Sequence, residues 1–356
     1  MTPRFHSLSV RDVRRETPDA ISVAFEVPDD LAPAYAFAPG QYLTLRTTLE
    51  GEEVRRSYSI CAGPHDGELR IAVKRVEGGA FSGWANEALQ PGHALDVMTP
   101  TGRFGAVEAG AGALHVGFAA GSGITPILSI VKGVLARPDG ARFVLFYGNR
   151  STTDMLFRTE LEELKDRHLG RLSVFHVLSR EEQDVPVLNG RLDREKARLL
   201  LSRLVPAEAV DHLYVCGPPG LAEDVETAAA ELGIPAERIH VERFVSEFGG
   251  KPRPKAPPPA PDAPSRSAAL IVDGKRRDVP VHEGETVLDA AIRAGLDLPY
   301  ACKGGMCSTC RAKVVEGEVA MDVNYSLEPW ELQAGFVLTC QARPRTERVV
   351  IDYDQM

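Results

Sequence analysis

Four cysteines near the C-terminal end of the chain have a spacing that could hold a metal centre. The first three follow the pattern C-x4-C-x2-C and the fourth comes 30 residues later: Cys302, Cys307, Cys310 and Cys340. This arrangement is typical of four thiolates that ligate a [2Fe–2S] cluster, and iron readily takes soft sulfur ligands. Because such a cluster carries one electron at a time, the chain should contain or meet a source of electrons.

The residues around these cysteines bear on which metal the loop binds. Gly304 and Gly305 allow the backbone to fold closely around inorganic sulfide, because glycine has no Cβ. Cys307 and Cys310 alone would also suit zinc, and a disulfide is a further alternative. Structural zinc sites usually combine two short-spaced ligand pairs, however, and no second C-x2-C or H-x3-H pair follows Cys310. The spacing therefore favours the cluster.

The composition indicates a multidomain protein of ordinary polarity. The chain has 356 residues, 44% hydrophobic and 26% charged, with a formal net charge of -9. The length suggests two or three domains, and the negative charge argues against nucleic acid or an anionic membrane as a partner. Thiolates on iron imply a reducing compartment, and residues 1–16 lack the apolar core of a signal peptide, so we expect a cytoplasmic protein.

Two features of the sequence could mislead an interpretation. Residues 109–131 carry no formal charge, but five glycines and Pro126 favour a buried strand, a turn and a helix over a membrane span. The two remaining cysteines, Cys61 and Cys216, are far apart in the chain and need not pair.

Residues 1–105 have the pattern of a small antiparallel β-barrel. Alternating apolar and polar stretches are separated by turn residues such as Gly40, Gly51 and Gly67. We expect a short helix at 82–89 and strands at 21–27, 41–46, 57–60, 69–76 and 94–98.

From residue 106 to about 248 the pattern changes to strands that alternate with helices. Near-continuous apolar strands of this kind are buried in parallel sheets, so the stretch predicts a doubly wound α/β domain. The expected strands are at 114–120, 143–147, 172–178 and 212–216, and the expected helices are from about 126 and at 156–165, 195–204 and 221–232.

Residues 249–264 contain seven prolines in sixteen positions, which predicts an extended, semi-rigid linker that lets the last domain move. The remaining residues, 265–356, have the pattern of an α+β domain. Its expected elements are a hairpin around Asp273 and Gly274, a helix at 286–295 capped by Thr286, and strands at 312–316, 336–339 and 349–352.

The segment Arg56-Ser57-Tyr58-Ser59 lies on a predicted barrel strand and has side chains suited to a flavin. Arginine can neutralise a pyrophosphate, an aromatic ring can stack on an isoalloxazine, and a serine hydroxyl can reach flavin N5. For so short a pattern, an ordinary solvated strand is the alternative. A Gly-rich helix start follows, and its backbone amides can bind a second phosphate. The residues expected there are Gly79, Phe81 and Ser82.

The stretch GSGITP at 121–126 follows a predicted buried strand and opens a helix, which is the context of a dinucleotide phosphate turn. It is not G-x-G-x-x-G, because Pro126 stands where the third glycine would be, and a Gly-rich connection without a ligand is the alternative. Cys216 and Gly217 end a later strand at the edge where α/β sheets bind ligands. Cys216 could equally be a small buried filler.

Taken in this order, R-x-Y-S at 56–59, G-x-G-x-T-P at 121–126 and C-G-P at 216–218 resemble the ferredoxin–NADP reductase superfamily. The resemblance implies an FAD-binding barrel, a nucleotide domain and hydride delivery to flavin N5. The flavin ligands that it implies are Arg56, Ser57, Tyr58, Ser59, Gly79, Phe81 and Ser82. The nicotinamide dinucleotide ligands that it implies are Gly121, Gly123, Thr125, Cys216 and Gly217.

The same resemblance bears on catalysis and on the choice of nucleotide. It implies catalytic roles for Ser59, Cys216 and Glu242, although Glu242 could equally serve packing. Ser179 and Arg180 resemble the pair that holds the 2′-phosphate of NADPH in these reductases, and arginine is suited to bidentate phosphate binding. We therefore expect NADPH as the nucleotide.

With the cysteine-rich domain added, the whole chain resembles the reductase subunits of bacterial phenylacetyl-CoA epoxidases (phenylacetyl-CoA monooxygenases). The resemblance rests on FHSL at 5–8, YGNR at 147–150, the cluster loop and VNYSLEP at 323–329. It implies a plant-type [2Fe–2S] ferredoxin domain of β-grasp fold. Electrons would pass from NADPH to FAD, to the cluster and to a di-iron oxygenase, a transient protein partner, in aerobic phenylacetate degradation. Methane and toluene monooxygenase reductases have similar parts but carry the ferredoxin in front.

Two alternatives remain open. A phthalate- or vanillate-type reductase would belong to the same enzyme class but bind FMN, use NADH and serve a Rieske-type oxygenase. A redox-sensing or scaffold protein would keep the cluster as a structural element, and it would not oxidise NADPH with an artificial acceptor.

Overall fold

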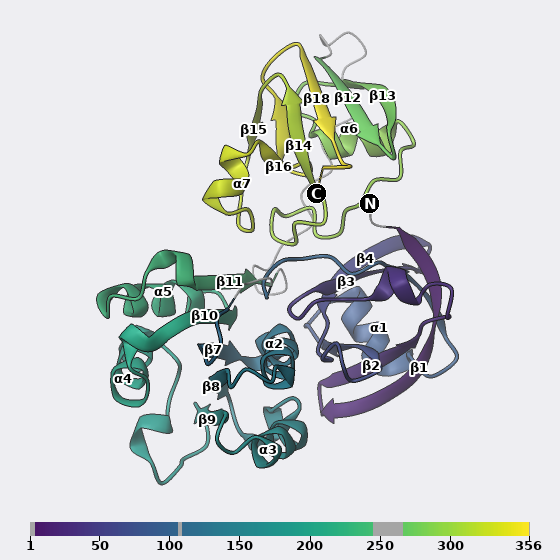
Figure 1. Cartoon of the computed structure of the whole chain (residues 1–356). Coiled ribbons are helices and arrows are strands. Elements are labelled where there is room, and N and C mark those ends of the chain that lie inside the picture. Colours follow the sequence, from purple (N-terminus) through teal and green to yellow (C-terminus); the bar gives the residue numbers. More distant parts are fainter. Residues whose placement is uncertain (1–3, 106–108, 245–265, 356) are drawn as a thin grey trace. The chain divides into compact units, whose positions relative to one another are not determined.

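The computed structural model describes residues 4–105, 109–244 and 266–355 (Figure 1). The predicted linker at 249–264 lies outside these residues. The chain divides into two compact units, of which the larger contains residues 6–54 and 58–244 and the smaller contains the C-terminal domain. The predicted flavin and nucleotide domains therefore share one unit. None of the helices in the described ranges is long and apolar enough to span a membrane.

The N-terminal part of the larger unit is a six-stranded sheet. Its strands lie in the order β4-β3-β6-β1-β2-β5, and the pairs β1/β2, β2/β5 and β3/β6 are antiparallel. A single bridge between Ile60 and Ile71 joins the end of the outer strand β4 to the other outer strand, β5. The strands are β1 (Phe5–Thr17), β2 (Ala20–Glu26), β3 (Tyr42–Leu49), β4 (Glu52–Ser59), β5 (Leu69–Lys74) and β6 (Ala94–Met98), and the helix is α1 (Ala80–Ala88).

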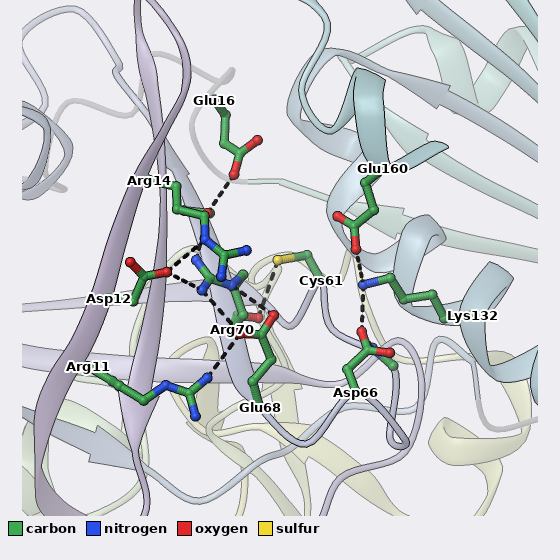
Figure 2. Close-up of polar contacts among 12 residues, drawn as sticks. Arg11, Asp12, Arg14, Glu16, Cys61, Asp66, Glu68, Arg70, Lys132 and Glu160 are labelled. Carbon is green, nitrogen blue, oxygen red and sulfur yellow. Dashed lines mark hydrogen bonds and ion pairs between the residues drawn. The ribbon is translucent and has the colours of Figure 1, made fainter. Parts of the chain in front are cut away.

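A buried arginine ties three of these strands together (Figure 2). The Arg70 side chain on β5 is only 4% exposed, and its Nη2 lies 2.6 Å from Asp12 Oδ2 on β1. Arg70 Nη1 donates to Ser22 Oγ on β2 at 2.9 Å, and Arg70 Nε lies 3.0 Å from Glu68 Oε1. Because a buried charge is costly unless it is paired, this set of contacts lets Arg70 occupy a buried position in the sheet.

The second part of the larger unit confirms the predicted doubly wound α/β architecture. All its strand pairs are parallel, in the order β11-β10-β7-β8-β9. Helices α2 and α3 cover one face of this sheet, and α4 and α5 cover the other (Figure 1). The strands are β7 (Leu114–Ala120), β8 (Arg142–Asn149), β9 (Leu172–Leu178), β10 (Val210–Gly217) and β11 (Ile239–Arg243), and the helices are α2 (Ile124–Ala136), α3 (Arg158–Arg167), α4 (Arg194–Leu204) and α5 (Leu221–Glu231).

The C-terminal domain is a mixed five-stranded sheet with two helices and a small second sheet. The large sheet has the order β13-β12-β18-β14-β16, in which β12 and β18 are parallel and the other pairs antiparallel. Asp273 and Gly274 form the predicted hairpin turn, both with positive φ. The strands are β12 (Arg266–Val272), β13 (Lys275–Val281), β14 (Arg311–Glu316), β15 (Val319–Met321), β16 (Phe336–Leu338), β17 (Ala342–Pro344) and β18 (Arg348–Asp352), and the helices are α6 (Val287–Arg293) and α7 (Pro329–Gln333).

Candidate functional site

The four predicted metal-binding cysteines come together at one end of the C-terminal sheet, as two pairs. Cys302 is hydrogen bonded to Cys307, and Cys310 to Cys340. A hydrogen bond from the Cys307 thiol lowers the pKa of the Cys302 thiol. Within the described residues, no three His, Cys, Asp or Glu side chains gather as a single ion would require. Two thiol pairs, each able to hold one iron, suit the two-iron cluster predicted from the spacing.

Backbone and amide groups orient the cysteine sulfurs. The Gly304 N–H donates to Cys302 Sγ at 3.3 Å, and Gln341 Nε2 donates to Cys340 Sγ at 3.4 Å. Gly305 has a φ of +78°, and a Cβ there would lie 3.0 Å from Val323 Cγ2. Hydrogen bonds of this kind to cluster sulfurs tune an iron–sulfur centre.

The segment 323–329, which the cysteine spacing does not connect with any cluster ligand, braces this loop. The Tyr325 N–H donates to Gly305 O at 3.0 Å, and Val323 packs on Gly305. Sequence spacing could not reveal this contact, since about twenty residues separate the two segments in the chain.

The turn at 121–126 packs directly against the end of β10. A Cβ on Gly123 would lie 2.1 Å from the Cys216 carbonyl oxygen, so only glycine fits there. Thr125 Oγ1 donates to Ser122 O at 3.0 Å, and the buried Tyr147 hydroxyl donates to Gly121 O at 3.2 Å. The structure thus brings the predicted nucleotide residues Gly121, Gly123, Thr125, Cys216 and Gly217 together, at the carboxyl ends of the neighbouring strands β7 and β10.

The three residues expected to be catalytic also meet. Ser59 Oγ donates to Glu242 Oε2 at 3.2 Å, and Ser59 is 5% exposed. Cys216 is the register partner of Glu242 in the parallel pair of β10 and β11, so their side chains point to the same face of the sheet. The end of β4 and the strands β10 and β11 therefore meet at these residues.

The environment of Glu242 changes its acid–base behaviour. Glu242 is partly exposed to solvent, but its carboxyl group is buried among protein atoms. Burial raises the pKa of this carboxyl to about 8, and the hydrogen bond from Ser59 lowers it only in part. A neutral carboxyl beside a serine hydroxyl is suited to holding or passing a proton.

The start of α1 offers unpaired backbone amides. The helix has no side-chain cap at Gly79, and the Ser82 hydroxyl closes the turn by accepting from the Val76 N–H at 3.1 Å. Phe81 is 1% exposed and its ring packs 5.5 Å from the Tyr58 ring, so only its backbone amide could reach a phosphate. An uncapped helix start fits a phosphate group. Arg56, the arginine predicted to bind the pyrophosphate, lies on β4 and is exposed.

The ends of β8 and β9 position the predicted 2′-phosphate residues. The Ser179 N–H donates to Asn149 O at 3.0 Å, and the Arg180 N–H donates to Arg150 O at 2.8 Å. Both arginine side chains are exposed. Glu181 is held away from them by the Thr152 N–H, which donates to its carboxylate at 2.7 Å and lowers its pKa. Arg150 is a second cation at this edge that sequence analysis did not identify as a site residue.

Comparison with protein families agrees with this geometry. Residues 7–105 match the oxidoreductase FAD-binding domain, residues 118–227 the oxidoreductase NAD-binding domain, and residues 270–345 the 2Fe-2S iron-sulfur cluster binding domain. The first range includes Ser59 and the start of α1, the second includes the turn at 121–126 with Cys216, Ser179 and Arg180, and the third includes the four cysteines.

Full-length relatives decide the assignment. A component protein of 1,2-phenylacetyl-CoA epoxidase from Escherichia coli (strain K12) is 45% identical over 352 residues, which cover 98% of both chains. The chain belongs to the family of this epoxidase component. It is an NAD(P)H-dependent oxidoreductase that serves as the electron-transfer component of a multicomponent oxygenase. The ferredoxin reductase component of 3-ketosteroid-9-alpha-monooxygenase from Rhodococcus rhodochrous is 34% identical, over 97% of this chain and 96% of that protein.

A solved structure shares the fold over nearly all of this epoxidase family member. Phthalate dioxygenase reductase matches with a TM-score of 0.59 and 23% identity, over 98% of each chain. At this identity the match concerns the fold alone. An intact type IV self-sufficient cytochrome P450 monooxygenase matches with a TM-score of 0.69 and 23% identity, over 98% of this chain and 41% of that one.

Proposed function

We propose that this protein is the reductase component of a phenylacetyl-CoA epoxidase, with NADPH as electron donor, FAD and a [2Fe–2S] cluster as carriers, and a di-iron oxygenase as acceptor. The observation that carries the proposal is the contact between Ser59 and Glu242, because it joins the flavin strand to the nucleotide domain. The 45% identity to the E. coli epoxidase component supports the choice of partner.

A bound FAD would supply the conversion of a two-electron hydride into single electrons that a [2Fe–2S] cluster can accept. The chain positions the groups for this conversion. Arg56 and the α1 amides would bind the pyrophosphate, and Ser57 and Tyr58 would line the isoalloxazine. Ser59, bonded to neutral Glu242, would hold a proton at flavin N5, and Cys216 would pack near the nicotinamide.

The nucleotide turn and the cysteine loop would bind the other two groups. Gly121, Gly123, Thr125 and Gly217 would cradle the dinucleotide, because glycine and a helix start let backbone amides approach phosphate. Cys302, Cys307, Cys310 and Cys340 would ligate the cluster. Ser179 and Arg180, with Arg150 beside them, would bind the 2′-phosphate that distinguishes NADPH from NADH.

The finer features of the two folds and the compartment belong to the same proposal. The bridge between Ile60 and Ile71 supports a closed β-barrel for the flavin domain. The packing of α6 on the mixed C-terminal sheet supports a β-grasp ferredoxin domain. Because a thiolate cluster requires reducing conditions, the protein is placed in the cytoplasm.

Reconstitution with a purified epoxidase oxygenase component tests the function. We expect NADPH oxidation coupled to conversion of phenylacetyl-CoA to a product heavier by one oxygen atom, detected by mass spectrometry. A Cys310→Ser variant is the matched control, because it should keep flavin reduction and lose product formation. Product formation with a Rieske-type oxygenase but not with the di-iron component would contradict the proposed partner, as would extracted flavin that proves to be FMN.

A further inference from the structure

Helix α2 connects the nucleotide turn to the flavin domain. It begins directly after Gly123 and runs to Ala136. Two of its side chains contact the loop that follows the flavin strand β4. Ser129 Oγ donates to the Ala62 carbonyl oxygen at 2.7 Å, and Lys132 Nζ donates to Asp66 Oδ2 at 2.6 Å.

The ammonium of Lys132 lies between two carboxylates from different parts of the unit (Figure 2). Asp66 comes from the flavin domain, and Glu160, whose Oε1 lies 2.5 Å from Lys132 Nζ, comes from α3 of the nucleotide domain. The Lys132 side chain is only 9% exposed. Although burial works against its charged form, Glu160 and Asp66 raise the pKa of Lys132 above its ordinary value. The lysine therefore stays charged and paired at the domain contact.

The loop that carries Asp66 is itself fixed. The Gly63 N–H donates to Asp66 Oδ2 at 2.9 Å, and the Asp66 N–H donates to Gly63 O at 3.0 Å. A mobile surface loop would not present its carboxylate in one place, whereas these two bonds hold Asp66 toward α2.

The two domains touch too closely here to slide past one another. A Cβ on Gly63 would lie 2.8 Å from Lys132 Cβ, and a Cβ on Gly133 would lie 2.5 Å from Pro39 Cγ. Close packing of this kind transmits a displacement rather than absorbing it. A change at Lys132 should therefore move α2 relative to the flavin domain.

Both sides of the contact lead directly to the candidate reaction centre. Lys132 lies nine positions after Gly123 along α2, roughly 13 Å at the helical rise, and Gly123 packs on Cys216. On the other side, the loop with Asp66 continues the strand that ends at Ser59. Two short and rigid paths thus join the ion pair to the nucleotide turn and to the flavin strand.

We propose that Lys132 is a positioning residue, whose contact with Asp66 sets the distance between the nucleotide turn at 121–125 and Ser59. The inference rests on the proposed function. In that function a hydride passes from a nicotinamide bound at the turn to a flavin bound at Ser59, so the rate depends on the distance between these two sites. Lys132 would not touch either group, and it would act only through α2. Reactions between bound partners are sensitive to misplacement, and about 1 Å can cost up to about a hundredfold in rate.

The two carboxylates on Lys132 provide a matched pair of variants. Asp66→Asn removes the charge that joins the two domains, while Glu160→Gln removes the charge that joins two helices of the nucleotide domain. Each takes one carboxylate from the same ammonium. We expect Asp66→Asn and Lys132→Met to slow single-turnover flavin reduction by NADPH by about tenfold or more. Both variants should leave the nucleotide Kd nearly unchanged and raise the primary deuterium isotope effect on flavin reduction. Glu160→Gln should retain most of the rate, and Lys132→Arg should restore part of it.

A second measurement does not depend on activity. Spin labels on Asp30→Cys in the flavin domain and Glu208→Cys in the nucleotide domain, both exposed positions, report the distance between the domains by pulsed electron paramagnetic resonance. In the full-length oxidised protein, Asp66→Asn should broaden or shift this distance distribution, while Glu160→Gln should leave it close to that of the parent.

Several outcomes would overturn the inference. Equal losses of rate in Asp66→Asn and Glu160→Gln would show that the ammonium only stabilises the fold, as would a fall in nucleotide affinity that accounts for the whole change in rate. An unchanged distance distribution in Asp66→Asn would also refute it. If neither NADPH nor NADH reduces the unsubstituted protein, the proposed function fails instead, and the spin-label distances still decide whether Lys132 sets the domain contact.

Discussion

Ser59 Oγ donates a 3.2 Å hydrogen bond to Glu242 Oε2, although 183 residues separate these two residues in the chain. The contact joins the strand expected to bind flavin to the last strand of the nucleotide sheet. It buries a carboxyl group whose pKa is raised to about 8. A buried carboxyl with so raised a pKa, held by a hydroxyl from another domain, is typical of functional sites.

The raised pKa of Glu242 predicts how stability depends on pH. Between the ordinary value of 4.5 and about 8, the folded protein keeps the carboxyl proton and the unfolded chain has lost it. The contribution of Glu242 to stability is therefore full below pH 4.5 and is lost as the pH rises to about 8. We expect Glu242→Gln to remove this slope from the urea midpoint, followed by flavin fluorescence. Glu237→Gln, at an exposed position, is the control, and an unchanged slope in Glu242→Gln would contradict the assignment.

Gly123 is predicted to tolerate no side chain. A Cβ would overlap the Cys216 carbonyl oxygen at 2.1 Å, so Gly123→Ala should cost about 1–3 kcal/mol or more in stability and weaken NADPH binding. Gly170→Ala is the matched control, because nothing lies within 4 Å of its Cβ, and it should change stability by less than about 1 kcal/mol. Urea unfolding and nucleotide titration of both variants check this, and equal behaviour would be inconsistent with the close packing.

The stability of the six-stranded sheet should depend on Arg70 far more than on its exposed neighbour Arg14. Both arginines pair with Asp12, but the Arg70 side chain is 4% exposed and the Arg14 side chain 60%. Removing one partner of a fully buried ion pair costs about 3–5 kcal/mol, and an exposed pair is worth about 0–1 kcal/mol. Because the Asp12 and Glu68 side chains are 36% and 16% exposed, the cost of losing Arg70 should lie between these ranges. We therefore expect Arg70→Met to destabilise the larger unit strongly and Arg14→Met only slightly, as measured by urea unfolding. Comparable losses would rule out the difference in burial as the cause.

Nucleotide preference should depend on Arg180. If this exposed side chain binds the 2′-phosphate, Arg180→Ala loses a charged hydrogen bond and raises the KM for NADPH by about tenfold or more, since such bonds contribute about 1.5–3 kcal/mol. The KM for NADH should stay nearly constant because NADH lacks that phosphate. Arg198→Ala, which removes an exposed arginine from α4, controls for net charge. A parallel rise for both nucleotides would argue for a general role in folding or binding.

Local patterns predicted most of the fold. Cysteine spacing, Gly-rich turns and apolar strands are each encoded within a short stretch of sequence. The strand β9, for example, has the predicted bounds, 172–178. Sequence analysis missed β1 and β11, and in the C-terminal domain the short elements β15, β17 and α7. The stretch Arg11–Glu16 on β1 is rich in charge and gives no apolar alternation, and β11 is a short outer strand defined by its pairing with β10.

The parts of the site that could not be predicted depend on contacts between distant segments. Glu242 was suggested by family resemblance, but its bond to Ser59 exists only in the folded chain. In the sequence, Lys132 and Asp66 look like ordinary charged surface residues. They pair only because the two domains meet in the folded chain. Tertiary contacts of this kind leave no periodic signal in the sequence, which is why local reasoning cannot detect them.

An anaerobic titration of the purified protein with NADPH, and separately with NADH, tests the central claim most directly. Flavin absorbance reports the first acceptor, and electron paramagnetic resonance reports the reduced cluster. The account predicts flavin bleaching followed by a reduced [2Fe–2S] signal, with NADPH the more effective donor, and no cluster signal in Cys310→Ser. Flavin reduction without a cluster signal in the unsubstituted protein, or no bleaching with either nucleotide, would contradict an electron path from nucleotide through flavin to the cysteine loop.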